Sequence, residues 1–202
     1  MNLKNRMSAA HLQKVIEGLG YKWFDRGYYN VNIIGVRSPN LVANSFDDTM
    51  LCAYMVNGVW KVKQWQITTD AGSYWIKNPM NEMGCSLLVP NQYEGAYEIA
   101  KHRGKYDALC QRLKTVEVYR DNNRDQILDF DAATKEWGMF GINIHRSNPT
   151  KTPIVVGKWS AGCQVFKQVD DFDEFMQICL QGAVYWGNSF TYTLIKEEDL
   201  KL

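Results

Sequence analysis

Apolar residues near the start of the chain recur at the spacing of a helix. Four of them fall on one face: Leu12, Val15, Ile16 and Leu19. Ser8 fits the N-cap of this helix, and Gly18 and Gly20 fit its end. The pattern predicts that residues 1–29 form a short helical segment packed on the body of the protein.

From about Asn30 onward, apolar and polar residues mostly alternate, which indicates strands. Residues 49–70 are expected to form a hairpin that turns at Asn57 and Gly58, a dipeptide that suits a tight primed turn. Residues 95–109 are predicted to hold a short helical turn. Further strands are expected in six segments: 31–37, 73–76, 85–89, 115–120, 139–145 and 191–195.

A second amphipathic helix is expected in residues 170–187. Asp170 or Asp171 could cap it, and Asp173 and Glu174 would then place negative charge in its first turn. Its apolar residues lie at helical spacing, so we expect them in the core: Phe172, Phe175, Met176 and Cys179. The whole pattern predicts a β-rich α+β fold, in which residues 30–202 form one mixed β-sheet or sandwich domain with a short N-terminal helix and a helix near the C-terminal side.

Composition excludes several classes of function. The chain has 202 residues, 46% of them hydrophobic and 22% charged, which suits one globular domain. The formal net charge is +1 and the basic residues are scattered, so we expect no nucleic-acid binding. No apolar run approaches the roughly 18 residues that span a bilayer, and no membrane insertion is expected. The first residues lack the features of a secretory signal, which predicts synthesis in a cytoplasm.

Cysteine and histidine usage argues against a metal site. The five cysteines are an odd number without a C-x-x-C pair, so neither a disulfide framework nor a structural zinc site is expected. The only histidines, His11, His102 and His145, form no close-spaced cluster. No metal and no cofactor are therefore predicted.

One pair of residues indicates nucleophilic chemistry. His145 ends the segment 139–145 on its less apolar face, and Cys163 follows 18 positions later, directly after Ser160, Ala161 and Gly162. A glycine there allows a tight turn, and backbone N–H groups of such a turn can stabilise an oxyanion. A nearby imidazole would take the thiol proton and raise the thiolate fraction. The alternative is a buried structural cysteine and an unrelated histidine.

This arrangement resembles the signature of the L,D-transpeptidase (YkuD-like) catalytic domain. That family carries a histidine, an intervening loop and then Ser/Thr-His-Gly-Cys; here His145 and the run Ser160 to Cys163 match in order and spacing. Residues 64–76 are similar to the Thr-rich, Gly-containing strand and turn that precede the family's site. The likeness is greatest from about 64 to 166, and other segments are similar to a subgroup common in bacteriophage genomes.

The resemblance implies a function and a substrate. Cys163 would attack the carbonyl at the L-centre of meso-diaminopimelate in a peptidoglycan stem peptide, with His145 as base and a thioester as intermediate. Water would resolve the thioester in L,D-endopeptidase or carboxypeptidase action, and an amine would resolve it in L,D-transpeptidation. A chain without an export signal fits a phage lysin, or an injected or virion-borne enzyme, that reaches the cell wall after release.

Two departures from the family pattern leave alternatives open. Ala161 stands where relatives have a second histidine, and His102 could take its place. The usual arginine after the cysteine is missing, because Gln164 follows. The substrate carboxylate then has four candidate partners: Arg120, Arg124, Arg146 and Lys158. Trp159 could line the groove.

The main alternative is a catalytically silent module of the same fold that binds peptidoglycan or serves in a virion. A papain-like enzyme is disfavoured, because its cysteine precedes its histidine and no histidine follows Cys163 here.

Overall fold

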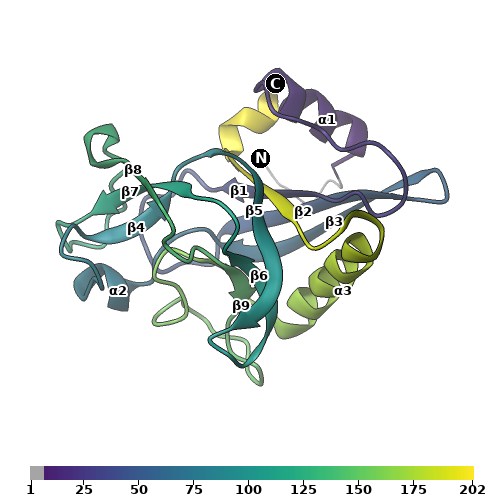
Figure 1. The fold of residues 1–202 in the computed structure, drawn as a ribbon. Coiled ribbons are helices and arrows are strands. Elements are labelled where there is room, and N and C mark those ends of the chain that lie inside the picture. The colour runs from purple at the N-terminus through teal and green to yellow at the C-terminus, as the bar shows by residue number, and fades with distance from the viewer. Residues whose placement is uncertain (1–6) are drawn as a thin grey trace.

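The computed structural model describes residues 7–202, whose strands form a closed eight-stranded barrel beside a three-stranded sheet (Figure 1). Around the barrel the order is β1, β11, β5, β6, β9, β10, β3, β2. Its strands are β1 (Asn32–Arg37), β2 (Asp48–Val56), β3 (Val59–Thr68), β5 (Asn91–His102), β6 (Tyr106–Gln111), β9 (Ile144–Arg146), β10 (Gln164–Phe166) and β11 (Phe190–Lys196). The small sheet has the order β4 (Cys85–Leu88), β7 (Val116–Asp121), β8 (Glu136–Gly138).

The helical elements are few. They are α1 (Ala9–Gly18), α2 (Ser73–Lys77), α3 (Val169–Trp186) and the 3₁₀ turns η1 (Ala132–Thr134) and η2 (Glu197–Lys201). Among residues 7–202, no helix combines the length and the apolar character needed to cross a membrane. The prediction of a β-rich fold with a helix towards each end is therefore confirmed.

The predicted sheet or sandwich is instead a barrel. It closes because β1, near the start of the chain, pairs in parallel with β11, near its end, with Ile33 opposite Tyr192. The weakest junction is between β6 and β9, where only Leu109 and Ile144 pair. Alternation along each strand indicates which face is apolar, but it does not indicate which distant strands pair. The sequence pattern therefore could not predict that the sheet closes into a barrel.

The β2–β3 hairpin forms as predicted. Asn57 and Gly58 connect the two strands and have φ values of 51° and 72°. A type I′ turn requires positive φ at both positions, and this backbone matches the right-handed twist of the strands.

Helix α1 is also confirmed, within the part of residues 1–29 that the structure describes. The Ser8 Oγ accepts a hydrogen bond from the His11 N–H at 3.2 Å, so Ser8 is the N-cap. Residues 1–6 of the predicted segment lie outside the described residues. The buried face of α1 packs on the outer face of the barrel around Ile34, Leu51 and Ile195, beside these residues of its own: Ala9, Leu12, Val15 and Ile16.

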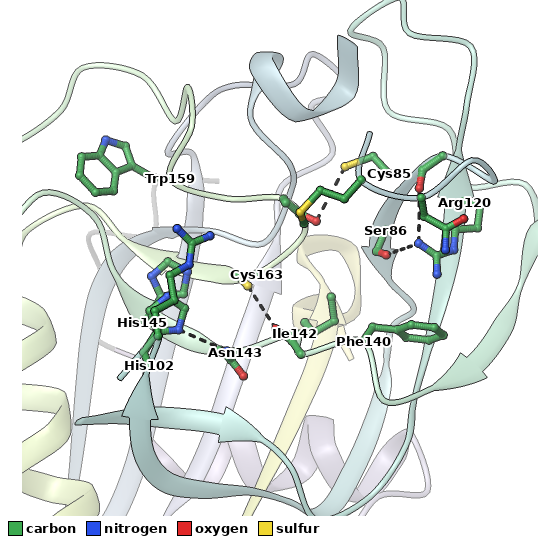
Figure 2. A pocket seen from close by; sticks show the side chains of 16 residues that line it. Cys85, Ser86, His102, Arg120, Phe140, Ile142, Asn143, His145, Trp159 and Cys163 are labelled. Atoms are coloured by element: carbon green, nitrogen blue, oxygen red, sulfur yellow. Dashed lines mark hydrogen bonds between the residues drawn. The ribbon is translucent and has the colours of Figure 1, made fainter. Parts of the chain in front are cut away.

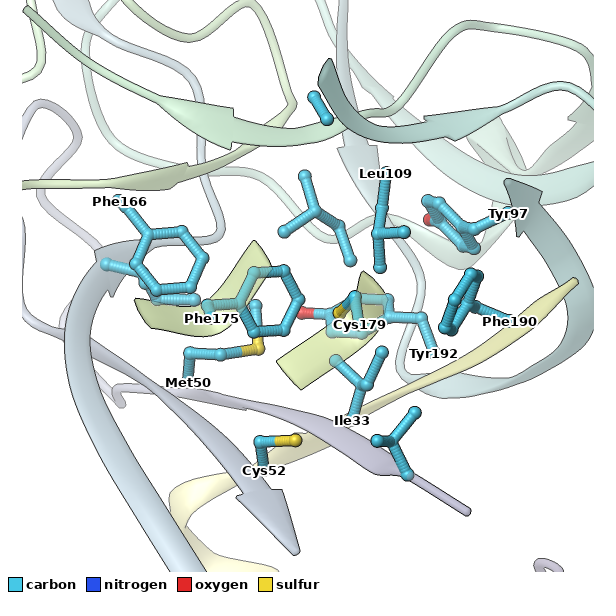
Figure 3. Close-up of a cluster of buried hydrophobic side chains, with 14 of the residues drawn as sticks. Ile33, Met50, Cys52, Tyr97, Leu109, Phe166, Phe175, Cys179, Phe190 and Tyr192 are labelled. Carbon is cyan, nitrogen blue, oxygen red and sulfur yellow. The ribbon is translucent and has the colours of Figure 1, made fainter. Parts of the chain in front are cut away.

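Helix α3 packs beside β9 and β10 (Figure 1) and contributes to the largest core. Phe175 and Cys179 are fully buried with Phe166 and Met50 (Figure 3), as the predicted core position of Cys179 requires. The N-cap differs from the prediction. It is Gln168, and both Asp170 and Asp171 already lie in the first turn.

Three local predictions were wrong. Residues 73–76 form helix α2 instead of a strand, and residues 95–109 belong to the β5–β6 hairpin instead of a helical turn. The hairpin turns at Arg103 and Gly104, with φ of 49° and 71°. Of the segment 139–145 only its last two residues are in a strand, β9. In each case contacts between distant segments outweigh a weak local preference.

We expect Phe175→Ala to lower the free energy of unfolding by about 3–5 kcal/mol, because it leaves a cavity in a close-packed core. Chemical denaturation measures this change. Val184→Ala on the same helix is the matched control; this side chain is 77% exposed, and its loss should change stability by less than about 0.5 kcal/mol. Equal effects of the two substitutions would contradict the placement of α3.

Candidate active site

A cleft of about 350 Å³ opens where the small sheet faces the β5–β6–β9–β10 side of the barrel. Figure 2 shows Cys163 between the histidines His102 and His145 on one side and Arg120 on the other. The predicted base, the predicted nucleophile and the second histidine thus line one cleft, although they come from β5, β9 and the turn before β10.

The parallel pairing of β9 and β10 brings the predicted pair together. Val165 lies opposite His145, and the Gln164 N–H donates to the Asn143 carbonyl at 2.9 Å. Cys163 directly precedes β10, so it stands at the same end of the strand pair as Asn143. Its side chain and that of His145 both reach the cleft.

Cys163 is the only one of the five cysteines that is partly exposed; the other four are buried. Its thiol donates to the Gly141 carbonyl at 3.5 Å, and not to either histidine. Burial raises the pKa of this thiol to about 11, against the opposing effects of a hydrogen bond from the Asn143 backbone and the charge of Arg103. This shift favours the protonated thiol in the resting cleft.

The tautomer of His145 follows from its one hydrogen bond. Its Nδ1 lies 2.8 Å from the Arg146 carbonyl, which can only accept, so Nδ1 carries the proton. The lone pair is then on Nε2, the form of the ring that can take a proton from a thiol. Burial, assisted by the neighbouring His102, lowers the pKa of His145 to about 3. At neutral pH the ring is uncharged and remains a proton acceptor.

His102 has the opposite tautomer. Its Nδ1 lies 3.2 Å from Asn143 Nδ2, and the Asn143 Oδ1 accepts from the Gln111 N–H at 2.9 Å, which sets the orientation of the amide. Nδ1 of His102 therefore accepts, and its proton is on Nε2. Burial lowers the pKa of His102 to about 4. The ring stacks on His145, with centroids 4.2 Å apart.

The turn from Ser160 to Cys163 is held by the serine side chain. Ser160 Oγ donates to the Cys163 carbonyl at 2.8 Å and accepts from the Gly162 N–H at 3.1 Å. The Gly162 amide is thus engaged, although it was expected to serve an oxyanion. Ala161 lines the cleft, and its carbonyl lies 3.8 Å from the Sγ of Cys85, which donates to it.

Gly162 cannot carry a side chain in this turn. Its φ is +113°, and a Cβ would lie 2.2 Å from the backbone oxygen of Ser86 in β4. The contact joins the cysteine turn to the small sheet across the floor of the cleft, so the position tolerates only glycine.

Two cations line the cleft. Arg120 is buried; its Nη1 donates to Ser86 Oγ at 2.6 Å, its Nε pairs with Glu136, and its guanidinium stacks on Phe140. Arg103, on the β5–β6 turn, is exposed. Arg120 was one of the four cations considered from the sequence. Arg103 was not, although it follows His102 directly.

The other predicted side chains divide between the cleft and its surroundings. Trp159 lines the cleft and is 37% exposed. Arg146 is not part of the lining, because its guanidinium lies over the Tyr106 ring at 4.2 Å. Lys158 lies over the Tyr74 ring, and Arg124 belongs to the loop after β7. Asn143 and Cys85 also line the cleft; nothing in the spacing of the sequence singled them out.

Comparison with known proteins adds no assignment. No protein-family model matches the chain, and neither a curated protein nor a solved structure matches it. The inference about function therefore depends on the cleft itself and on the resemblance of the His145 to Cys163 segment.

We expect Gly162→Ala to lower the free energy of unfolding by about 2–3 kcal/mol, because the new Cβ would meet backbone at a φ that favours glycine. The control is Gly157→Ala, whose φ is also positive at +56° but where a Cβ would meet nothing within 4 Å. If both variants unfold at the same denaturant concentration, the close approach to Ser86 does not restrict this turn.

Alkylation of native protein should modify Cys163 alone, since the other cysteines are buried. With a thiol pKa of about 11, the rate should rise about tenfold per pH unit from pH 7 to 10, as the thiolate fraction does. Mass spectrometry of iodoacetamide-treated samples gives the site and the rate. A rate that levels off by pH 8 would contradict the protonated resting thiol.

Proposed function

We propose that this chain is a cysteine-dependent acyl-transfer enzyme that acts on peptidoglycan stem peptides. One observation carries the proposal. The only partly exposed cysteine lies in the same cleft as a histidine whose Nε2 carries no proton. A nucleophile and a base are the two groups that covalent catalysis at a carbonyl requires.

The reaction would begin from the neutral pair. Cys163 Sγ forms a bond to the substrate carbonyl carbon while the thiol proton passes to Nε2 of His145. The tetrahedral intermediate then breaks its C–N bond, the imidazolium returns the proton to the leaving amine, and a thioester remains. A pKa of about 3 makes His145 a weak base in the first transfer and, once protonated, a strong acid in the second. Water or an acceptor amine then attacks the thioester. His145 takes the proton of the attacking group and returns it to the Cys163 sulfur as the C–S bond breaks.

Charge in the cleft suits a stem peptide. Such peptides carry free carboxylates, and the cleft offers the guanidinium groups of Arg120 and Arg103. Arg120 already pairs with Glu136, so the exposed Arg103 is the better partner for a substrate carboxylate. His102, whose Nε2 carries the proton, is suited to donate a hydrogen bond to bound substrate.

The resemblance supplies the finer assignment. The segment from His145 to Cys163 resembles the YkuD-like signature. From this likeness come three finer parts of the proposal: attack at the L-centre of meso-diaminopimelate, the three alternative activities (L,D-endopeptidase, carboxypeptidase or L,D-transpeptidase), and the role of a phage lysin. The products of the reaction would distinguish the three activities from one another.

A second candidate function is a catalytically silent peptidoglycan-binding or virion module of this fold. One observation favours it: burial raises the pKa of the Cys163 thiol to about 11, so the resting protein holds a poor nucleophile. Ala161, which stands where the family has a second histidine, also favours the silent module.

Incubation with diaminopimelate-containing muropeptides, followed by mass spectrometry, tests both candidates. We expect product masses that reveal loss of D-alanine, cut cross-bridges or exchanged stems. Cys163→Ala should reduce the rate on the order of a thousandfold or more. Cys179→Ala is the matched control, because it removes a buried thiol outside the cleft and should keep activity.

Unchanged muropeptide masses, together with sedimentation of the protein on insoluble peptidoglycan, would favour the silent module. Full activity of Cys163→Ala would refute the nucleophile.

A further inference from the structure

The loop that follows β7 carries oxygen-bearing side chains at alternate positions. They are Asp121, Asn123 and Asp125, followed by Asp129, with the backbone of Ile127 between the last two. In calcium-binding loops of the EF-hand type, ligands come from positions 1, 3, 5 and 9, with a backbone carbonyl at position 7 and a bidentate glutamate at position 12. This loop has a suitable residue at each of the first five positions, and Ala132 stands at the twelfth. Neither the proposed reaction nor the cleft uses this loop.

The polar side chains of the loop converge. Asn123 Nδ2 donates to Asp125 Oδ2 at 3.1 Å and to Asp129 Oδ2 at 2.6 Å. The amide group therefore stands between two carboxylates that would otherwise repel each other, where a cation would be more strongly attracted.

A buried carboxylate oxygen at the mouth of the loop is an independent sign of a missing ligand. Asp121 is 1% exposed, and its Oδ1 has no hydrogen-bond partner among the described residues. Its Oδ2 accepts the Asp129 N–H at 3.3 Å, so the carboxylate faces the loop. A buried, unpaired carboxylate oxygen is costly, and a bound cation would satisfy it.

The backbone leaves the fifth oxygen open. Ile127 pairs with Val42 in an isolated bridge, whose two hydrogen bonds use the carbonyls of Gln126 and Leu41 and not that of Ile127. Gln126 has a φ of +76°, a conformation that calcium loops commonly give to glycine at this sixth position. The loop thus has the backbone turn that such sites use.

We propose that residues 121–129 bind one Ca²⁺ ion through five oxygens of the loop: Asp121 Oδ1, Asn123 Oδ1, a carboxylate oxygen of Asp125, the carbonyl of Ile127 and a carboxylate oxygen of Asp129. Within residues 7–202, no group of three or more His, Cys, Asp or Glu side chains stands ready to hold a metal. Binding therefore needs the carboxylates of Asp121, Asp125 and Asp129 to draw together around the ion. It also needs the Asn123 amide to turn its oxygen inward, away from the Asp125 N–H that donates to it at 3.1 Å.

Isothermal titration of the full chain with CaCl₂, after removal of divalent ions with EDTA, tests the site. We expect one ion per chain, with a dissociation constant on the order of 10⁻⁴ M. Asp125→Asn and Asp129→Asn should each weaken binding at least about tenfold, because each removes a charged ligand. Asp173→Asn is the matched control; it removes one exposed carboxylate from α3 and should bind as the wild type does.

Circular dichroism of each variant verifies that it is folded. Asp125 is exposed, so its substitution disturbs no core packing. Absence of binding heat at millimolar CaCl₂ would overturn the proposal, as would wild-type affinity in both loop variants. Equal affinity for MgCl₂ would contradict the calcium assignment, since Mg²⁺ demands a stricter octahedral geometry.

Discussion

The parallel pairing of β9 and β10 is the constraint on which the whole cleft depends. Parallel neighbours cannot be joined by a tight turn and need a crossover of a dozen or more residues. Residues 147–163 provide that crossover, so the long separation of His145 and Cys163 along the chain is a consequence of the topology. The contact of Gly162 with Ser86 then holds the end of the crossover against the small sheet.

Proton placement in the cleft follows from burial more than from charge. Desolvation keeps the thiol protonated and both imidazoles neutral, as their pKa values of about 11, 3 and 4 indicate. Backbone and amide groups decide which ring nitrogen carries each proton. The two stacked histidines are therefore not interchangeable, because His145 can accept at Nε2 and His102 can donate there. Because these groups are neutral, the resting site avoids the free-energy cost of burying charged side chains.

The sequence predicted those elements that local chemistry decides. Ser8 caps its helix, Asn57 and Gly58 turn their hairpin, and the apolar stripe of α3 faces the core. It failed where distant contacts decide. Gly72 is the N-cap of helix α2 and packs so closely on Gly157 that a Cβ would lie 2.1 Å from the Gly157 oxygen. No pattern in residues 73–76 predicts this contact. The partners of Arg120 and the stacking of His102 on His145 likewise depend on pairings that only the folded sheet creates.

Barrel closure has a consequence for behaviour at high concentration. Within residues 7–202 every barrel strand has a neighbour on each side, although β10 pairs with β3 only at Ile67 and Thr68, so closure covers just the end of that edge of β3. The small sheet ends at β4 and β8. β4 is fully buried, and β8 has three residues. Short or covered edges are poor templates for another chain. The architecture therefore limits edge-to-edge pairing in the small sheet, and the part of β3 before Ile67 is a barrel edge that closure by β10 does not cover.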